Sequence, residues 1–245
     1  MDTLTKPTQP IFLTAEWRKL LIVNYHIDRS LLVPYLPYKT ELDLFKGKCY
    51  VSLVGFRFIN TKLKGISVPF HRDFEEINLR FYVRYFDSIT WKRGVVFLKE
   101  IVPKPALTII ANSIYKENYM TLPTRSRLDE HMGNIKVEYE WKFKGKWDLV
   151  SLTALSTRFD ILPESEEEFI TEHFWGYTQI GDYRTSQYQV EHPRWQMYSV
   201  TGSEINVRFG DLYGAAFFFL KNTHPTSIML AEGSKISVRS ADKIE

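Results

Sequence analysis

The alternation of apolar and polar residues is clearest between Phe74 and Arg84, where the sequence reads FEEINLRFYVR. Side chains of a β-strand alternate between its two faces, so this run predicts a strand with one mostly apolar face. The opposite face carries Glu76, Asn78, Arg80 and Tyr82. These polar side chains point either into solvent or into a pocket, and the pattern leaves both alternatives open.

Short alternating or β-branched runs recur along the chain and predict roughly ten strands. Residues 41–45 and 49–58 flank a Lys-Gly-Lys turn and predict one hairpin, and residues 135–143 and 147–155 predict another. Near the C-terminus, short strands are expected at several places, one of them at residues 216–220.

Helices are expected at irregular intervals between these strands. Pro105 suits the first turn of a helix over residues 106–116, and Ser165 with Glu168 forms a capping-box signature for a second helix. This order does not match the regular strand–helix alternation of a parallel sheet. We therefore expect an α+β, mostly β fold, either an antiparallel barrel or a pair of curved sheets with a few peripheral helices. Barrels of this size often hold one small ligand.

Composition supports a β-rich globular chain. Hydrophobic residues make up 44% of the 245 residues and aromatic residues 15%, and aromatic residues favour strands. No linker or repeat divides the sequence, so we expect a single domain over residues 1–245, with a loose Pro- and Thr-rich arm at residues 1–10.

Charge and cysteine content exclude several function classes. The net charge of +3 is small and evenly mixed, which does not favour nucleic acid as a partner. No apolar run reaches the roughly 18 residues of a membrane span. Cys49 is the only cysteine and the N-terminus is polar, so a reducing cytoplasm is expected. A homo-oligomer is compatible with the sequence.

Metal, cofactor and nucleophile motifs are not found. The six histidines are scattered, and the pair Glu172-His173 lacks the second histidine of a zinc-binding HExxH motif. The sequence contains no GxSxG elbow, phosphate loop or GxGxxG motif. We expect neither a metal nor a cofactor.

Several motifs together resemble the YqjF-like family of uncharacterised conserved proteins, over nearly the whole chain. They are FEEINLRFYV, GVVFLKEI, the proline-led helix to SIYKENY, EHFWGYT and HPRW. The resemblance implies a fold similar to that of acetoacetate decarboxylase, a cone-shaped antiparallel β-barrel with an internal cavity and a lysine that forms Schiff bases.

The decarboxylase pattern fits this chain only in part. Its substrate-pocket arginine falls on Arg18 and its acid on Glu76, but its second acid falls near residues 50–52, where there is no carboxylate. Its lysine pair falls on Tyr119 and Met120, with Lys116 about one helical turn earlier. Tyrosine cannot form an imine, so we expect no Schiff-base chemistry.

The leading hypothesis is a pocket that binds a small anionic or carbonyl-bearing molecule, with Glu76 as the acid/base. The residues expected to bind the ligand are Arg18, Asn78, Arg80, Tyr82 and Tyr119. Whether the protein is an enzyme stays open. The alternatives are a binding or sensing protein without catalysis, an oligomeric scaffold with a filled barrel, or a solvated sheet face with ion pairs across strands.

Overall fold

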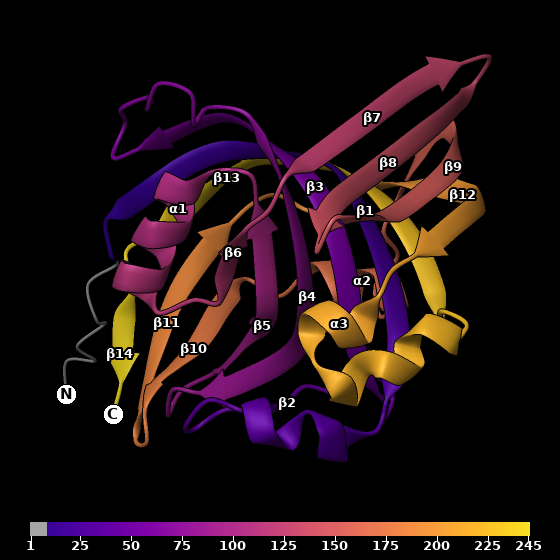
Figure 1. Ribbon diagram of the computed structural model, residues 1–245. Helices are drawn as coiled ribbons and strands as arrows, with labels where there is room; N and C mark the ends of the chain where they lie inside the picture. Colours follow the sequence, from indigo (N-terminus) through magenta and orange to yellow (C-terminus); the bar gives the residue numbers. More distant parts are fainter. Residues whose placement is uncertain (1–8) are drawn as a thin grey trace.

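The computed structural model describes residues 9–245. The arm expected at residues 1–10 therefore lies outside the described residues except for its last two positions. The described chain forms a 14-stranded sheet (Figure 1). Its strands are β1 (Ile11–Ile27), β2 (Glu41–Leu42), β3 (Cys49–Leu63), β4 (Phe74–Phe86), β5 (Trp91–Val102), β6 (Tyr119–Thr121), β7 (Thr124–His131), β8 (Asn134–Phe143), β9 (Lys146–Asp160), β10 (Trp175–Gly181), β11 (Arg184–Glu191), β12 (Gln196–Asn206), β13 (Ser227–Arg239) and β14 (Asp242–Ile244).

Hydrogen bonds join most strands in the order β14-β11-β10-β5-β4-β3-β1-β13-β12-β9-β8-β7. An additional pairing joins β11 to β13, where Val190 lies opposite Val238. The pairings from β11 through β10, β5, β4, β3 and β1 to β13 therefore close into a ring. The mostly β prediction is confirmed, but the pairing is mixed, because β5 pairs in parallel with both β10 and β6.

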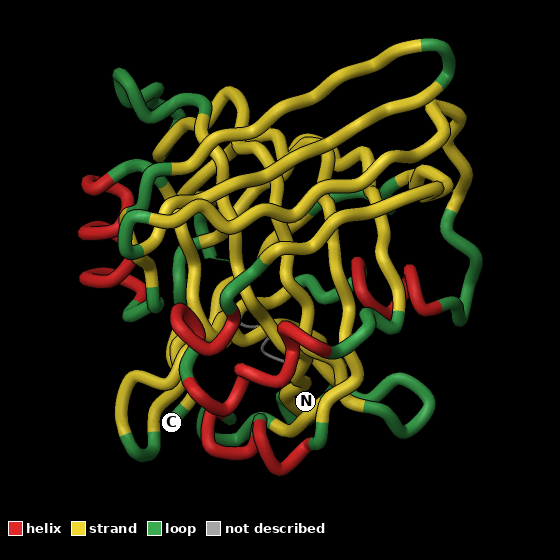
Figure 2. Tube along the Cα trace, turned by 45° about the vertical axis from the view of Figure 1, so that its right-hand side comes forward, coloured by secondary structure: helices red, strands yellow, loops and turns green. Residues whose placement is uncertain are grey.

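The strands β12, β9, β8 and β7 continue from β13 and cover the outside of the ring (Figures 1 and 2). Tyr139 of β8 packs directly over Gly55 of β3, where an added Cβ would lie 2.7 Å from the Tyr139 ring. Its hydroxyl donates to the carbonyl oxygen of Lys19 at 2.8 Å. The hairpin expected at residues 135–155 is confirmed as β8–β9.

The first predicted hairpin is wrong. Only Phe45 and Lys48 pair across the turn, and β2 pairs with β4 instead of β3. The chain leaves the predicted strand at Asp43, whose side chain binds Arg93 and His173 in the interior. These polar contacts, made by residues far apart in sequence, give no local signal.

Helical segments lie around the ring: η1 (Arg29–Leu31), η2 (Val33–Tyr35), α1 (Pro105–Ile110), η3 (Ala111–Tyr115), α2 (Glu166–Thr171), α3 (Phe209–Tyr213) and η4 (Ala215–Asn222). The helix after Pro105 is confirmed as α1 and η3. The Ser165 Oγ accepts from the Glu168 amide at 3.1 Å, as its capping signature predicts. None of the described helices is long and apolar enough to cross a membrane.

One predicted strand, at residues 216–220, is instead part of the 3-10 helix η4. Its two buried side chains, Phe217 and Leu220, are three residues apart, which is the period of a 3-10 helix. A short run of consecutive apolar residues does not distinguish the two structures, because strands and helices can both be buried.

Strand β4 is buried on both faces, which decides between the two alternatives for its polar side. Ile77, Leu79 and Phe81 belong to the core between the ring and the covering strands. On the other face, Glu76 and Asn78 are only 3% and 1% exposed. The polar face therefore points into the ring, not into solvent.

Candidate functional site

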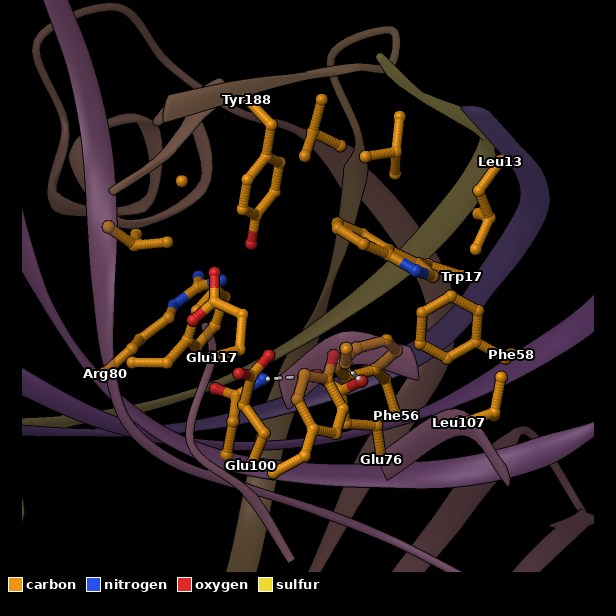
Figure 3. Close-up of a pocket in the computed structure, with 18 of the residues that line it drawn as sticks. Leu13, Trp17, Phe56, Phe58, Glu76, Arg80, Glu100, Leu107, Glu117 and Tyr188 are labelled. Carbon is orange, nitrogen blue, oxygen red and sulfur yellow. Dashed lines mark hydrogen bonds between the residues drawn. The ribbon is translucent and has the colours of Figure 1, made fainter. Parts of the chain in front are cut away.

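A cavity of about 150 Å³ lies within the ring of strands (Figure 3). Its walls are mostly aromatic and aliphatic, with side chains from β1, β3, β4, β5 and α1 among them. Polar and ionisable groups also line it: Glu76, Asn78, Arg80, Glu100, Glu117, Tyr119, Thr171, His173, Tyr188 and His192. An apolar pocket with a few convergent polar groups is typical of a small-molecule site.

Four of the predicted site residues line this cavity. Glu76, Asn78 and Arg80 project from β4, and Tyr119 projects from β6. The alternation of β4 brings the first three to one face, as the sequence predicts. Tyr119 reaches them because β6 pairs in parallel with β5, the neighbour of β4.

The other two predicted residues do not line the cavity. Arg18 lies in a separate surface pocket, where it pairs with Glu16 at 2.6 Å. The inward place on β1 is taken by Trp17. Tyr82 is buried, but its hydroxyl shares a hydrogen bond of 2.7 Å with Ser52. The structure therefore does not bring Arg18 and Tyr82 to the cavity with the other four predicted residues.

Glu76 is held by two donors. Asn78 Nδ2 donates to Glu76 Oε1 at 3.0 Å, and the Tyr119 hydroxyl donates to Oε2 at 3.1 Å. Burial raises the pKa of Glu76 to about 7, against these hydrogen bonds and the charge of Arg80, which favour the carboxylate. A carboxyl with this pKa exchanges protons readily near neutral pH.

Two further buried carboxyls share the cavity, and sequence reasoning missed both. Glu100 of β5 lies opposite Asn78 in the strand register. Burial, and then the charges of Glu117 and Glu76, raise its pKa well above the ordinary value. Burial also raises the pKa of Glu117 to about 7, and in Figure 3 the Tyr188 hydroxyl points toward its carboxyl end.

Of these two residues, Glu100 left a signal in the sequence and Glu117 did not. Glu100 is a charged residue next to Ile101 and Val102 in a predicted strand, and glutamate is rarely buried unless it is paired. Glu117 follows Lys116, whose backbone has a left-handed φ of 59°. This turn directs Glu117 inward while Lys116 is exposed, and the local sequence does not predict it.

Several buried polar atoms around the cavity have no hydrogen-bond partner within the described chain. They are Asn78 Oδ1, Arg80 Nε, Glu100 Oε2, Glu117 Oε1 and His173 Nδ1. Buried polar groups in proteins are almost always hydrogen-bonded. The hydrogen-bonding capacity of these five atoms is therefore not used by the described chain.

The described residues that line the cavity include no lysine. Lys116 instead borders a separate surface pocket with Lys64 and Arg184. Within residues 9–245, no cluster of three or more His, Cys, Asp or Glu side chains has the arrangement of a metal site. The groups available for chemistry in the cavity are thus carboxyls, phenols, imidazoles and a guanidinium.

Solved structures share this fold. Acetoacetate decarboxylase from Legionella pneumophila subsp. pneumophila superposes with a TM-score of 0.64 at 12% identity, covering 99% of this chain and 93% of that one. The enduracididine biosynthesis enzyme MppR, in a structure with pyruvate, gives a TM-score of 0.65 at 10% identity, covering 99% and 93%. These identities support similarity of fold.

Sequence comparison finds a closer likeness. The uncharacterized protein YqjF of Bacillus subtilis (strain 168) is 26% identical over 197 residues, which cover 78% of this chain and 76% of YqjF. Residues 14–235 match the family DUF2071, described as an uncharacterized conserved protein. This match spans most of the sequence and confirms the resemblance expected from its motifs, so the chain belongs to the DUF2071 family.

Proposed function

We propose that the cavity binds a small molecule with a carboxylate or carbonyl group and catalyses proton transfer on it without a Schiff-base lysine. The observation that carries this proposal is the group of buried carboxyls Glu76, Glu100 and Glu117 in one apolar cavity. Burying several acids together costs folding free energy. Strongly perturbed carboxyls in a cleft are typical of functional sites.

The surroundings of the carboxyls suggest a division of roles. Glu76 accepts hydrogen bonds at both oxygens, an arrangement that suits a base. Glu100 has the neighbours that keep a carboxylic acid protonated, so it suits an acid. Arg80, with an unpartnered Nε, suits the anchor for a ligand carboxylate.

These roles support one elementary step. Glu76 removes a proton from the carbon next to a ligand carbonyl, and the electron pair of that C–H bond forms a carbon–carbon double bond. The carbonyl oxygen takes a proton from Glu100, so an enol forms and the total charge is conserved. Because Glu76 and Glu100 exchange protonation states, the reverse step restores both.

Small 2-oxo acids are the first ligands to test. They carry both groups that the cavity suits, and a protein of similar fold is described in complex with pyruvate. In this proposal the closed ring serves as a barrel around the ligand, within a single cytoplasmic domain that needs no cofactor, metal, membrane or nucleic acid.

A binding or sensing protein without catalysis would use the same cavity. The unpartnered polar atoms favour a ligand in either case. A scaffold with a filled barrel is less consistent with a cavity of about 150 Å³. The two ligand-binding alternatives differ only in what the carboxyls do after the ligand binds.

Hydrogen–deuterium exchange at the methyl group of pyruvate in D₂O, followed by NMR, tests the proposal. We expect exchange with the wild-type protein and its loss in Glu76→Gln, with pyruvate still bound. Glu75→Gln is the matched control, because Glu75 lies on the opposite face of β4 and binds Thr124 and Ser126. Exchange that survives in Glu76→Gln would remove Glu76 from the role of base.

Binding of pyruvate without any exchange would favour the sensing alternative. Borohydride reduction in the presence of pyruvate, followed by mass spectrometry, tests the absence of imine chemistry. We expect the protein mass to stay unchanged. Labelling of Lys116 would contradict the proposal.

A further inference from the structure

His173 lies between α2 and β10, and its side chain is only 1% exposed. Its ring packs against Tyr82 and Phe169, with centroid distances of 4.8 and 5.0 Å. These contacts fix the plane of the imidazole. The residue lines the cavity, yet the acid/base step proposed above makes no use of it.

Asp43 determines which ring nitrogen carries the proton. His173 Nε2 lies 3.0 Å from Asp43 Oδ2, and Arg93 Nε donates to the same oxygen at 2.6 Å. Burial alone would raise the pKa of Asp43, but the hydrogen bonds from His173 and Arg93 hold it below the ordinary value. An ionised carboxylate only accepts hydrogen bonds, so Nε2 must carry a proton.

The other nitrogen is then a free acceptor. Burial lowers the pKa of His173 to about 4, and the positive charges of Arg93 and Arg80 also lower it. The hydrogen bond with Asp43 and the negative charge of Asp43 act in the opposite direction. The ring is therefore neutral at neutral pH, with its single proton on Nε2. Nδ1 is buried and has no hydrogen-bond partner within the described chain.

We propose that His173 Nδ1 accepts a hydrogen bond from a hydroxyl group of the ligand, and that Asp43 is the positioning residue that keeps this nitrogen unprotonated. Together with Arg80 as the carboxylate anchor, this assigns small hydroxy acids as a ligand class of the cavity. The inference rests on the proposed function, because it requires that the cavity bind a small acid.

The Asp43→Asn variant tests the tautomer. An asparagine oxygen can still accept from Arg93, while its amide donates to Nε2 and moves the ring proton to Nδ1. The hydroxyl-accepting nitrogen then becomes a donor. Asp148→Asn is the matched control, because Asp148 is also buried and paired with an arginine, Arg208 at 2.8 Å, but does not line the cavity.

The experiment is ¹⁵N NMR of the histidine rings during titration with lactate and with propionate, which lacks the hydroxyl. In the wild type we expect an unprotonated Nδ1 whose signal shifts with lactate and not with propionate. We expect lactate to bind about tenfold more tightly than propionate, the effect of one hydrogen bond. Asp43→Asn should abolish this preference, and Asp148→Asn should keep it.

Each other outcome overturns the inference. If Nδ1 of His173 carries a proton in the wild type before any ligand is added, the assigned tautomer is contradicted. If both acids bind equally and the His173 signals do not move, the inference fails while the proposed function stands. If neither these acids nor pyruvate bind, the proposed function fails with it.

Discussion

The Tyr119 hydroxyl donates a hydrogen bond of 3.1 Å to Glu76 Oε2, which links β6 to β4 over the intervening strand β5. This hydrogen bond favours the ionised form of Glu76. Removing it in Tyr119→Phe should therefore raise the pKa of Glu76 further above its present value of about 7. We expect the pKa to increase by about one to two units, since hydrogen bonds to charged groups contribute about 1.5–3 kcal/mol.

The pH dependence of the carboxyl C=O stretch in infrared spectra measures this change, with Glu76→Gln identifying the band. Tyr177→Phe is the control, because Tyr177 is also buried but its hydroxyl donates to the carbonyl oxygen of Lys92 at 3.1 Å. An unchanged midpoint in Tyr119→Phe would show that the hydrogen bond does not stabilise the charge.

Glu100 is expected to destabilise the folded protein at high pH. Burial and the charges of Glu117 and Glu76 raise its pKa, so above the ordinary value of 4.5 the folded state holds a proton that the unfolded state releases. The free energy of unfolding then falls as pH rises. Glu100→Gln removes this effect and should stabilise the protein by about 1–3 kcal/mol at pH 8.

At pH 5 the gain in stability from Glu100→Gln should be smaller, because the Glu100 carboxyl of the unfolded state is then partly protonated. Thermal unfolding at the two pH values checks the difference. Glu204→Gln, a change at an exposed carboxylate, should leave the melting temperature nearly unchanged at both. An equal gain at pH 5 and pH 8 would contradict the assigned cause.

Binding of an anion should be coupled to proton uptake. Glu76 and Glu117 both have a pKa of about 7, so they are mostly protonated below that pH and mostly charged above it. A ligand carboxylate at Arg80 is repelled only by the charged forms. We therefore expect the affinity for pyruvate to fall between pH 6 and pH 8, by up to about tenfold per pH unit for each coupled proton.

Calorimetry in two buffers of different ionisation enthalpy measures the number of protons taken up. Glu76→Gln should reduce that number, and the control Glu75→Gln should not. If the affinity for pyruvate rises with pH, or if pyruvate binds without proton uptake, a charged carboxyl cluster around the ligand is excluded.

The sequence predicted the shared face of Glu76, Asn78 and Arg80 because strand alternation is a local rule. The sequence left the direction of that face open. The opposite face of β4 is buried by β8, a strand far along the chain that covers the outside of the ring. Arg18 was expected at the cavity from the resemblance alone, whereas Trp17 takes the inward position on β1, whose pairing with β3 shifts register between Arg18 and Leu21. Pairing between distant segments, which local patterns do not contain, determines these positions.

The position of His173 at the cavity, paired with Asp43, was also not predictable from the sequence. Its partner Asp43 is 130 residues away, in a segment where the predicted hairpin at residues 41–58 does not form. His173 lies in the EHFWGYT motif, but the motif records only spacing along the chain and does not show that the ring meets Asp43. Pairs of this kind become visible only in the three-dimensional structure.

Gly176 provides a test of the wall that faces Glu117. It lies opposite Tyr188 in the pairing of β10 with β11, and an added Cβ would come within 2.2 Å of Tyr188 Cζ. The phenol end of Tyr188 must therefore move in Gly176→Ala. We expect a loss of about 1–3 kcal/mol in stability, the usual cost of overpacking.

The displaced hydroxyl can no longer donate to Glu117, whose pKa should then rise above its present value of about 7. A protonated Glu117 does not repel the ligand carboxylate, so pyruvate binding near pH 7 should tighten, and its pH midpoint should move upward. Denaturant unfolding and calorimetry measure the two effects. Gly202→Ala is the control, because no atom lies within 4 Å of its added Cβ. If both alanine variants bind pyruvate as the wild type does, the position of Tyr188 does not affect the ligand.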